Sequence, residues 1–247
     1  MGERNADPRY RRQIAVPEFG EAAQAALSAA TVALVGCGAL GGALADTLVR
    51  MGVGALRIAD ADTVALDNLH RQILFTEADE HTPKVAAGAD RLRRLNTAVN
   101  VDARNMRVTG ENYDAFFSGA DLVLDATDNV PTRFLINDWC VRRCVPWVYA
   151  GVAGVAGLVL PVLPGGPCLR CLYPEPPGEA SVAHPDQCGI LPPTVSLAAS
   201  LQVTQALRIL NGTARAGELI RLNVWTAEVR SATLNRNPDC PCCGRRD

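Results

Sequence analysis

Short apolar runs alternate with amphipathic segments through the first 150 residues of the chain, and this alternation alone predicts a fold. Runs rich in aliphatic and β-branched residues predict strands at 31–35, 56–59, 99–103, 122–124 and 147–149. Apolar residues recur with helical spacing at 43–51, 84–95 and 131–143. Strands that alternate with helices are typical of an α/β protein with a doubly wound, mostly parallel, Rossmann-like sheet.

The pattern changes after Gly151. Nine of the 16 prolines lie between Pro161 and Pro193, where we expect two short strands within 157–162 and then a long irregular loop. Beyond this loop the spacing predicts a helix and then two antiparallel strands, at 194–210, 219–224 and 228–234. The second half of the chain is therefore expected to add a C-terminal antiparallel portion to the parallel sheet.

We expect a single domain over residues 1–247, because the chain contains no internal repeat and no low-complexity linker. Within it we distinguish an N-terminal helical arm, a nucleotide-binding half and a half that faces a partner, at 1–30, 31–150 and 151–247.

Composition narrows the function classes. The chain is 48% hydrophobic and 20% charged with a net charge of −2, which predicts a globular protein with no attraction to nucleic acid or to membrane surfaces. The polar start of the sequence lacks the apolar core of a signal peptide, so we expect a cytoplasmic protein. In that compartment nine cysteines favour metal binding or catalysis over disulfides.

Three glycines follow the first predicted strand and precede the next helix: Gly36, Gly38 and Gly41. Glycines at this spacing let the backbone approach a phosphate, whose charge a helix N-terminus attracts. Asp60 ends the second predicted strand, 19 residues after Gly41, where a carboxylate can bind ribose hydroxyls. A tight turn without a ligand has the same spacing, and so do sites for NAD, FAD, SAM and ATP.

Polar and charged residues follow this motif: Asp62, Asn68, Arg71, Gln72 and Lys84. Lys84 is the only lysine beside 23 arginines, and an ammonium acts differently from a guanidinium. Several cations near a phosphate-binding loop favour a triphosphate over hydride transfer. Asp128 and Asn129 follow the fourth strand, where a carboxylate could hold Mg²⁺. Each residue taken alone also fits a solvated surface position.

Two CxxC pairs indicate a metal site formed by Cys168, Cys171, Cys240 and Cys243. Four thiolates suit tetrahedral Zn²⁺, and the role would be structural because no coordination position stays open. A redox dithiol or buried thiols would share this pattern, and Cys242 could act as an alternative ligand. Cys188 lies at the end of the long loop, where an exposed thiol could be a nucleophile or an incidental loop residue.

Together these motifs resemble the ThiF/MoeB branch of the E1-like adenylyltransferases, the superfamily of ubiquitin-activating enzymes. The resemblance extends from Tyr10 to Gly244 and rests on several spaced motifs in the family's order. These are 10–14, 36–42, 60–63, 68–72, Lys84, 125–129, both CxxC pairs and 200–202.

This resemblance implies ATP-dependent adenylation of the C-terminal glycine carboxylate of a partner protein, with release of pyrophosphate. The partner would be a small β-grasp, ubiquitin-like sulfur-carrier protein that ends in Gly-Gly, prepared in this way for thiocarboxylate formation. A separate protein would donate the sulfur. The cofactors implied are ATP, Mg²⁺ and Zn²⁺.

The same resemblance implies roles for individual residues. Arg71, Gln72 and Lys84 would bind phosphates and Asp60 the ribose. Asp128 would hold Mg²⁺ or position the reacting groups, and Arg12 would reach in from the other subunit of a homodimer. At one point the sequence departs from the family, whose loop cysteine aligns with Pro185, so that Cys188 lies three residues later.

Three other functions remain open at this point. The same chemistry could activate a peptide, a tRNA-linked carboxylate or another small carboxylate. A NAD-dependent oxidoreductase would explain the glycines and Asp60, but it would leave the cations without a role. A scaffold that keeps the fold without activity is the third.

Overall fold

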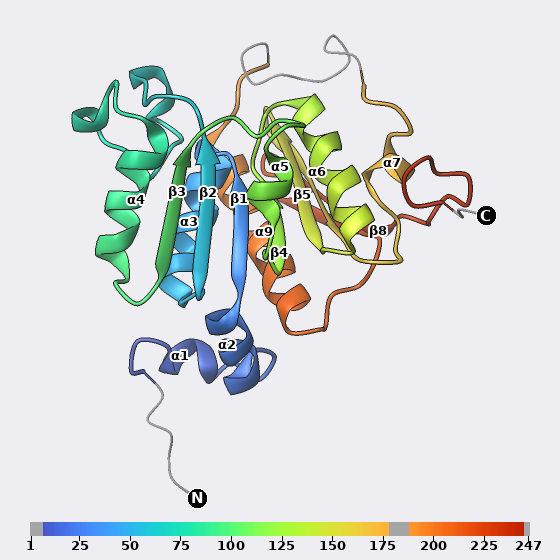
Figure 1. Cartoon of the computed structure of the whole chain (residues 1–247), viewed down its shortest axis with the longest axis horizontal. Coiled ribbons are helices and arrows are strands. Elements are labelled where there is room, and N and C mark those ends of the chain that lie inside the picture. The colour runs from blue at the N-terminus through green and yellow to red at the C-terminus, as the bar shows by residue number, and fades with distance from the viewer. Residues whose placement is uncertain (1–6, 178–187, 245–247) are drawn as a thin grey trace, which may run out of the picture.

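A computed structural model of the chain describes residues 7–177 and 188–244. Its centre is an eight-stranded sheet in the order β3-β2-β1-β4-β5-β6-β7-β8 (Figure 1). The first five strands in the chain are parallel: β1 (Thr31–Val35), β2 (Ala55–Asp60), β3 (Asn100–Asn105), β4 (Leu122–Asp125) and β5 (Trp147–Ala153). The last three pair antiparallel: β6 (Ala156–Val162), β7 (Glu218–Asn223) and β8 (Glu228–Thr233).

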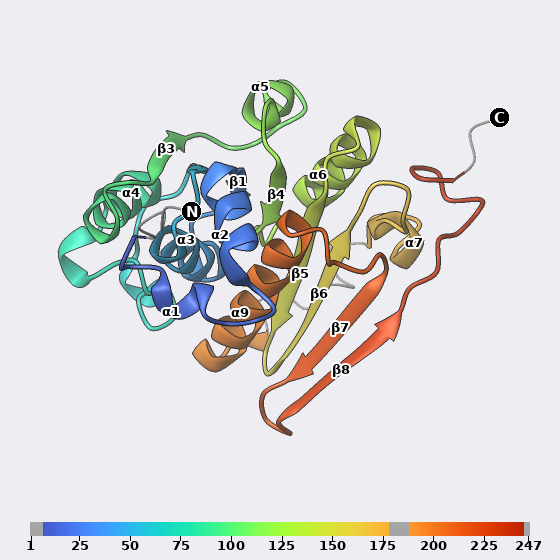
Figure 2. The same cartoon turned by 90° about the horizontal axis from the view of Figure 1, so that it is seen from below.

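Helices cover both faces of this sheet. On one face lie α3 (Ala39–Met51), α4 (Lys84–Leu95) and α9 (Pro192–Leu210). On the other lie α5 (Tyr113–Phe117), α6 (Val130–Arg143) and the short α7 (Leu169–Leu172), as Figure 2 shows. The arm contains α1 (Arg11–Ile14) and α2 (Gly20–Ala29), and two 3₁₀ turns, Leu66–Asn68 and Glu77–Asp79, follow β2.

Two hydrophobic cores lie on the two faces. Leu34, Leu44 and Val203 belong to the core under α3 and α9, whereas Phe116 and Trp147 belong to the core under α5 and α6. A parallel sheet covered on both sides requires continuous apolar strands. This explains why β1 and β4 are apolar except for Thr31 and Asp125 at their ends, and it confirms the α/β architecture expected from the sequence.

The structure differs from the expected elements in several places: α3 begins at Ala39 rather than at residue 43, β5 extends to Ala153, and α7 was not expected. The helix α5 was not expected, because its five residues are too few to show a helical period. The two strands expected within 157–162 are one strand, β6, which pairs with β5 from Trp147 to Ala153. The helix expected from Thr194 begins at Pro192, since proline suits the first turn of a helix.

Part of the loop expected at 172–187 lies outside the described residues, which resume at Cys188. None of the helices in the described part of the chain is long and apolar enough to cross a membrane.

Candidate active site

A cavity of about 1050 Å³ opens at the carboxyl ends of the parallel strands. There β1 lies beside β4, while the helices that follow them, α3 and α6, lie on opposite faces of the sheet. This divergence opens a crevice in doubly wound folds and places whatever follows each strand at its rim. The residues after β1, β2 and β4 are the ones that the sequence singled out.

The glycine loop after β1 forms part of the wall of this crevice. Gly36 has φ +99°, and a Cβ there would lie 2.6 Å from the carbonyl oxygen of Ala126, so only glycine fits. A Cβ on Gly41 would overlap the carbonyl oxygen of Gly36. Gly36 and Gly38 both line the cavity, and a Cβ on Gly38 would meet only the Gln72 amide nitrogen, at 3.6 Å. Gly36 and Gly41 therefore shape the loop, and Gly38 leaves room for a ligand.

Asp60 is held in place by the same loop. One carboxylate oxygen accepts the backbone N–H of Cys37 at 2.7 Å, and the other accepts that of Asp62 at 2.8 Å. Both aspartates line the cavity. The fixed carboxylate of Asp60 matches the position at which ribose hydroxyls bind in such folds.

Two positively charged side chains, which follow β2 in the chain, line the cavity. The side chain of Lys84 is 9% exposed, and its ammonium lies 3.0 Å from the carboxylate of Asp62. The Arg71 guanidinium donates to Asn68 Oδ1 at 2.7 Å. Gln72 is buried, and its Oε1 has no hydrogen-bond partner within the described residues. Together these side chains offer two positive charges and polar amide groups to an anionic ligand.

Asp128 and Asn129 lie at the start of α6. The side-chain oxygen of Asn129 accepts the backbone N–H of Thr132 at 2.9 Å and thereby caps the helix. Asp128 is exposed and lines the cavity. The carboxylate available to a cation at this rim therefore belongs to Asp128, while the oxygen of Asn129 is already engaged.

A buried trio that the sequence analysis did not single out lies beneath this rim. Asp125 is fully buried, and the Nε of Arg133 lies 3.4 Å from its carboxylate. The guanidinium also donates to the Thr127 carbonyl at 2.6 Å and stacks over the ring of Tyr149. Burial raises the pKa of Asp125, which Arg133 opposes, and burial raises the pKa of Tyr149 to about 12.

Gln202 connects this trio to the opposite face of the sheet. It is fully buried on α9, and its amide donates to the backbone carbonyls of Asp125 at 2.7 Å and Val148 at 3.0 Å. The segment 200–202 was part of the family pattern, but nothing in its sequence indicated this contact. For Arg133, the only available signal was its position one turn after Asn129.

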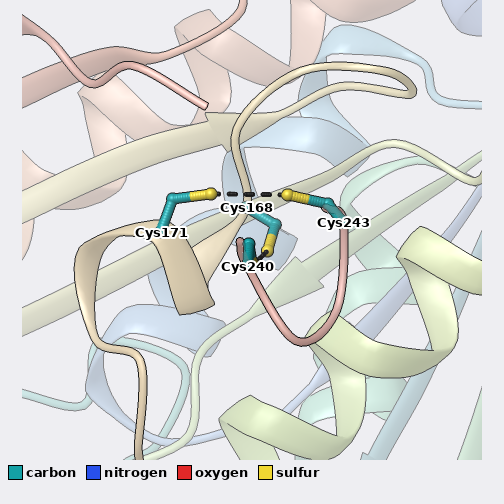
Figure 3. Close-up of side chains that lie close together, drawn as sticks. All are labelled: Cys168, Cys171, Cys240 and Cys243. Atoms are coloured by element: carbon teal, nitrogen blue, oxygen red, sulfur yellow. Dashed lines mark hydrogen bonds between the residues drawn. The ribbon is translucent and has the colours of Figure 1, made fainter. Parts of the chain in front are cut away.

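The four cysteines of the CxxC pairs form a second site (Figure 3). Their sulfur atoms all lie within 4.8 Å of one another, with Cys168 3.7 Å from Cys240 and Cys171 3.3 Å from Cys243. A tetrahedral zinc ion with Zn–S bonds of about 2.3 Å separates its sulfur ligands by roughly 3.8 Å. The donor set and the spacing therefore fit Zn²⁺.

Comparison with known proteins identifies the family. The model of the ThiF family matches residues 10–242, which is nearly the whole chain. The chain belongs to the ThiF family. This confirms the resemblance to ThiF/MoeB-type, E1-like enzymes that the motifs indicated.

Two relatives within the ThiF family cover almost the whole chain. A "Sulfur carrier protein adenylyltransferase" of Thermus thermophilus is 38% identical over 244 residues, which are 96% of this chain and 90% of the relative. A "Sulfur carrier protein ThiS adenylyltransferase" of Bacillus subtilis is 40% identical over 245 residues, which are 97% of this chain and 72% of the relative.

A solved structure with lower sequence identity also supports the fold. The structure "Crystal structure of E. coli MccB + ATP" superposes with a TM-score of 0.82 at 21% sequence identity. The match covers 96% of this chain and 75% of that one, and at this identity it establishes the shared fold alone.

Two residues of this ThiF family member for which the sequence predicted a catalytic role do not line the cavity of the chain to which they belong. Arg12 is exposed on α1, beyond the amino-terminal ends of the parallel strands, whereas the cavity lies at their carboxyl ends (Figure 1). Cys188 is exposed where the described chain resumes, and its sulfur lies 3.5 Å from the Gly189 carbonyl oxygen. The other residues predicted for the nucleotide line the cavity, except Gly41, which supports the loop from behind.

Proposed function

We propose that this chain uses ATP to adenylate the C-terminal glycine carboxylate of a small, ubiquitin-like sulfur-carrier protein that ends in Gly-Gly. One observation carries the proposal: a single cavity brings together the glycine loop, Asp60, Arg71, Lys84 and Asp128. Triphosphate chemistry needs this combination, and a dinucleotide-dependent hydride transfer does not. The printed names of the two relatives, which specify sulfur-carrier proteins, support the choice of substrate.

In the proposed reaction the carboxylate attacks the α-phosphorus of ATP, and pyrophosphate leaves. Asp60 binds the ribose, while Arg71, Gln72 and Lys84 hold the phosphate oxygens and neutralise the charge that moves to the leaving group. Asp128 would hold Mg²⁺, which supplies further charge neutralisation when it is bound. Gln72 would donate to a phosphate oxygen through its Nε2, which lies toward Gly38, whereas its unpartnered Oε1 is an acceptor and would need a donor such as a ligand hydroxyl.

The carrier would enter from the second half of the chain. The cavity extends to Leu158 on β6, Tyr173 after α7, Arg221 on β7 and Arg230 on β8. This continuity supports our division of a single domain into a nucleotide-binding half and a partner-facing half. The antiparallel strands are therefore proposed as the surface along which the tail of the carrier reaches ATP.

We further propose that the cysteine cluster holds one structural Zn²⁺. Four sulfur ligands leave no open position for catalysis, so the metal would tie the C-terminal residues 240–243 to the segment 168–171. Cys242 is not one of the four ligands proposed, because its sulfur does not belong to the group of sulfur atoms that all lie within 4.8 Å of one another.

The exposed Arg12 supports a homodimer in which each arm serves the cavity of the other subunit. Within one chain α1, which contains Arg12, lies beyond the amino-terminal ends of the parallel strands and the cavity lies at their carboxyl ends, so a second chain is required if Arg12 is to touch ATP. Cys188 is proposed to act only after adenylation: its thiolate would attack the acyl carbon of the acyl-adenylate, AMP would leave, and the resulting thioester would then receive sulfur from a separate protein.

The test is ATP–pyrophosphate exchange in the presence of Mg²⁺ with a panel of small β-grasp proteins that end in Gly-Gly. We expect exchange with one member and none when its last glycine is deleted. ATP binding without exchange on any member would contradict the carrier substrate and favour a peptide or another small carboxylate. Tight NADH binding without ATP binding would contradict adenylation altogether.

A further inference from the structure

Asn137 connects both halves of the cysteine cluster to α6. Its side chain is fully buried, and its Oδ1 accepts the backbone N–H of Leu169 at 2.9 Å. Its Nδ2 donates to the sulfur of Cys242 at 3.4 Å and to Asp138 at 3.0 Å. One amide thus contacts the turn that contains Cys168 and Cys171 and also the turn that contains Cys240 and Cys243.

Asp138, the residue after Asn137, also connects α6 to α7. Arg170 forms a two-pronged ion pair with Asp138, with distances of 2.8 and 2.7 Å, and its guanidinium stacks over the ring of Phe134. Two consecutive residues of α6 therefore hold two consecutive residues of α7. The orientation of α7 relative to α6 is fixed by polar contacts with defined directions.

This connection leads from the cluster to the cavity. Leu169 and Tyr173, at the two ends of α7, both line the cavity, and the Tyr173 N–H donates to the Leu169 carbonyl at 2.8 Å. On α6, Asn129, Arg133 and Asn137 follow one another at four-residue intervals, which places them on one face of the helix. The first two line the cavity, and the third holds the cluster.

We propose that Asn137 is a positioning residue that couples the cysteine cluster to the cavity wall formed by α7, so that metal in the cluster sets the affinity for the acyl substrate. This inference rests on the proposed function for the identity of that substrate. The glycine loop follows β1, Asp60 ends β2 and Lys84 begins α4, whereas α7 follows β6, which β4 and β5 separate from β1 in the sheet. The affinity for ATP is therefore expected to be independent of Asn137 and of the metal.

The experiment crosses two perturbations, zinc removal and Asn137→Ala, in the full chain. In the wild type we expect chelation of zinc to lower the affinity for the carrier about tenfold, the low end of the range over which loss of an outer-shell partner changes metal affinity or activity. In Asn137→Ala the affinity should already be lower by a similar factor, and zinc removal should add little. ATP affinity should change less than about twofold throughout.

Ile136→Val provides a matched control, because Ile136 is equally buried on the same helix and has no polar contact with the cluster. Zinc removal should lower its affinity for the carrier by the same factor as in the wild type. Additive effects of Asn137→Ala and zinc removal would overturn the proposal, and so would an equal loss of ATP affinity.

A second measurement is independent of activity and of the metal-free state. Hydrogen exchange at the Leu169 amide should be faster in zinc-loaded Asn137→Ala than in the wild type, because its acceptor is removed. Unchanged protection at Leu169 would contradict the coupling. If no carrier is adenylated by the wild type, the proposed function fails, whereas the amide exchange still decides whether Asn137 positions α7.

Discussion

Gly36 faces the carbonyl group of Ala126 so closely that a Cβ on Gly36 would lie 2.6 Å from that oxygen. The two residues follow β1 and β4, the neighbouring strands between which the cavity opens. Close approach of these two backbones therefore sets the shape of the crevice, and a glycine with positive φ is what permits it.

The glycines of the loop are expected to divide into two classes. Gly36→Ala combines a clash with a strained backbone, which costs about 1–3 kcal/mol, so it should lower the unfolding temperature as well as ATP affinity. Gly38→Ala meets only Gln72 at 3.6 Å and should weaken ATP binding with less loss of stability. Calorimetry of both variants checks this, and equal destabilisation by the two would contradict it.

Lys84 is expected to be essential for pyrophosphate exchange and dispensable for folding. Lys84→Ala removes the ammonium beside Asp62, and Lys84→Arg places a planar, longer group in a nearly buried position. Both should lose exchange by more than about 100-fold, and Asp128→Ala should do the same. Circular dichroism should be unchanged. Near-normal exchange in both single variants, Lys84→Ala and Asp128→Ala, would refute the proposed chemistry.

The cluster should contain about one zinc per chain in metal analysis of the purified protein. Cys171→Ser should lose the zinc and lower the unfolding temperature, by about 2–4 °C for each kcal/mol lost in a domain of this size. Cys242→Ser is the control and should keep the metal. Absence of zinc in the wild type, with all four thiols alkylated in the native state, would exclude the site.

Arg12 allows a test of shared sites. Arg12→Ala and Lys84→Ala should each be inactive alone. When the two are mixed and allowed to exchange subunits, activity should return to roughly a quarter of the wild-type rate, because a mixed twofold dimer has one intact site. No recovery, under conditions where light scattering confirms subunit exchange, would place Arg12 outside the partner's cavity.

Asp125 predicts a direction for the pH dependence of stability. Burial raises its pKa, so the folded state binds the proton more tightly than the unfolded state. Its contribution is present below the usual carboxyl pKa of about 4 and is lost as the pH rises through the raised value. Relative to Asp125→Asn, the wild type should therefore gain stability as the pH falls from 7 to about 4.

Urea unfolding of both proteins across this pH range measures that difference. The exposed Asp90 provides a control, since Asp90→Asn removes a carboxylate that lies 2.8 Å from Arg94 on the surface of α4. A difference between wild type and Asp125→Asn that stays constant with pH would show that the buried carboxylate does not titrate in this range.

Periodicity predicted most of this fold, because a parallel sheet covered on both faces leaves a strong apolar signal in each strand. It failed at α5, where five residues are too few to display a helical period. It also divided β6 into two strands, since Gly157 and Pro161 interrupt the apolar run although both residues pair with β5.

The candidate site could be predicted to the extent that its residues follow one another in the chain. The glycine loop and the cysteine pairs are local patterns, and the structure brings their members together. Arg133 and Asn137 were missed because each is a single polar residue on a helix, and their importance arises from contacts with distant segments. The roles proposed for Arg12 and Cys188 stay predictions. The role of Arg12 requires a second chain.

The single lysine has a practical consequence. Reductive methylation with ¹³C-formaldehyde modifies amines and leaves guanidinium groups untouched, so Lys84 would be the only labelled side chain in the protein. Its ammonium lies at the cavity, 3.0 Å from Asp62, and would give one side-chain dimethylamine resonance, beside that of the α-amino group, which responds to whatever replaces that contact. The molecule thus contains a built-in magnetic resonance probe of the cavity at which we propose that phosphates bind.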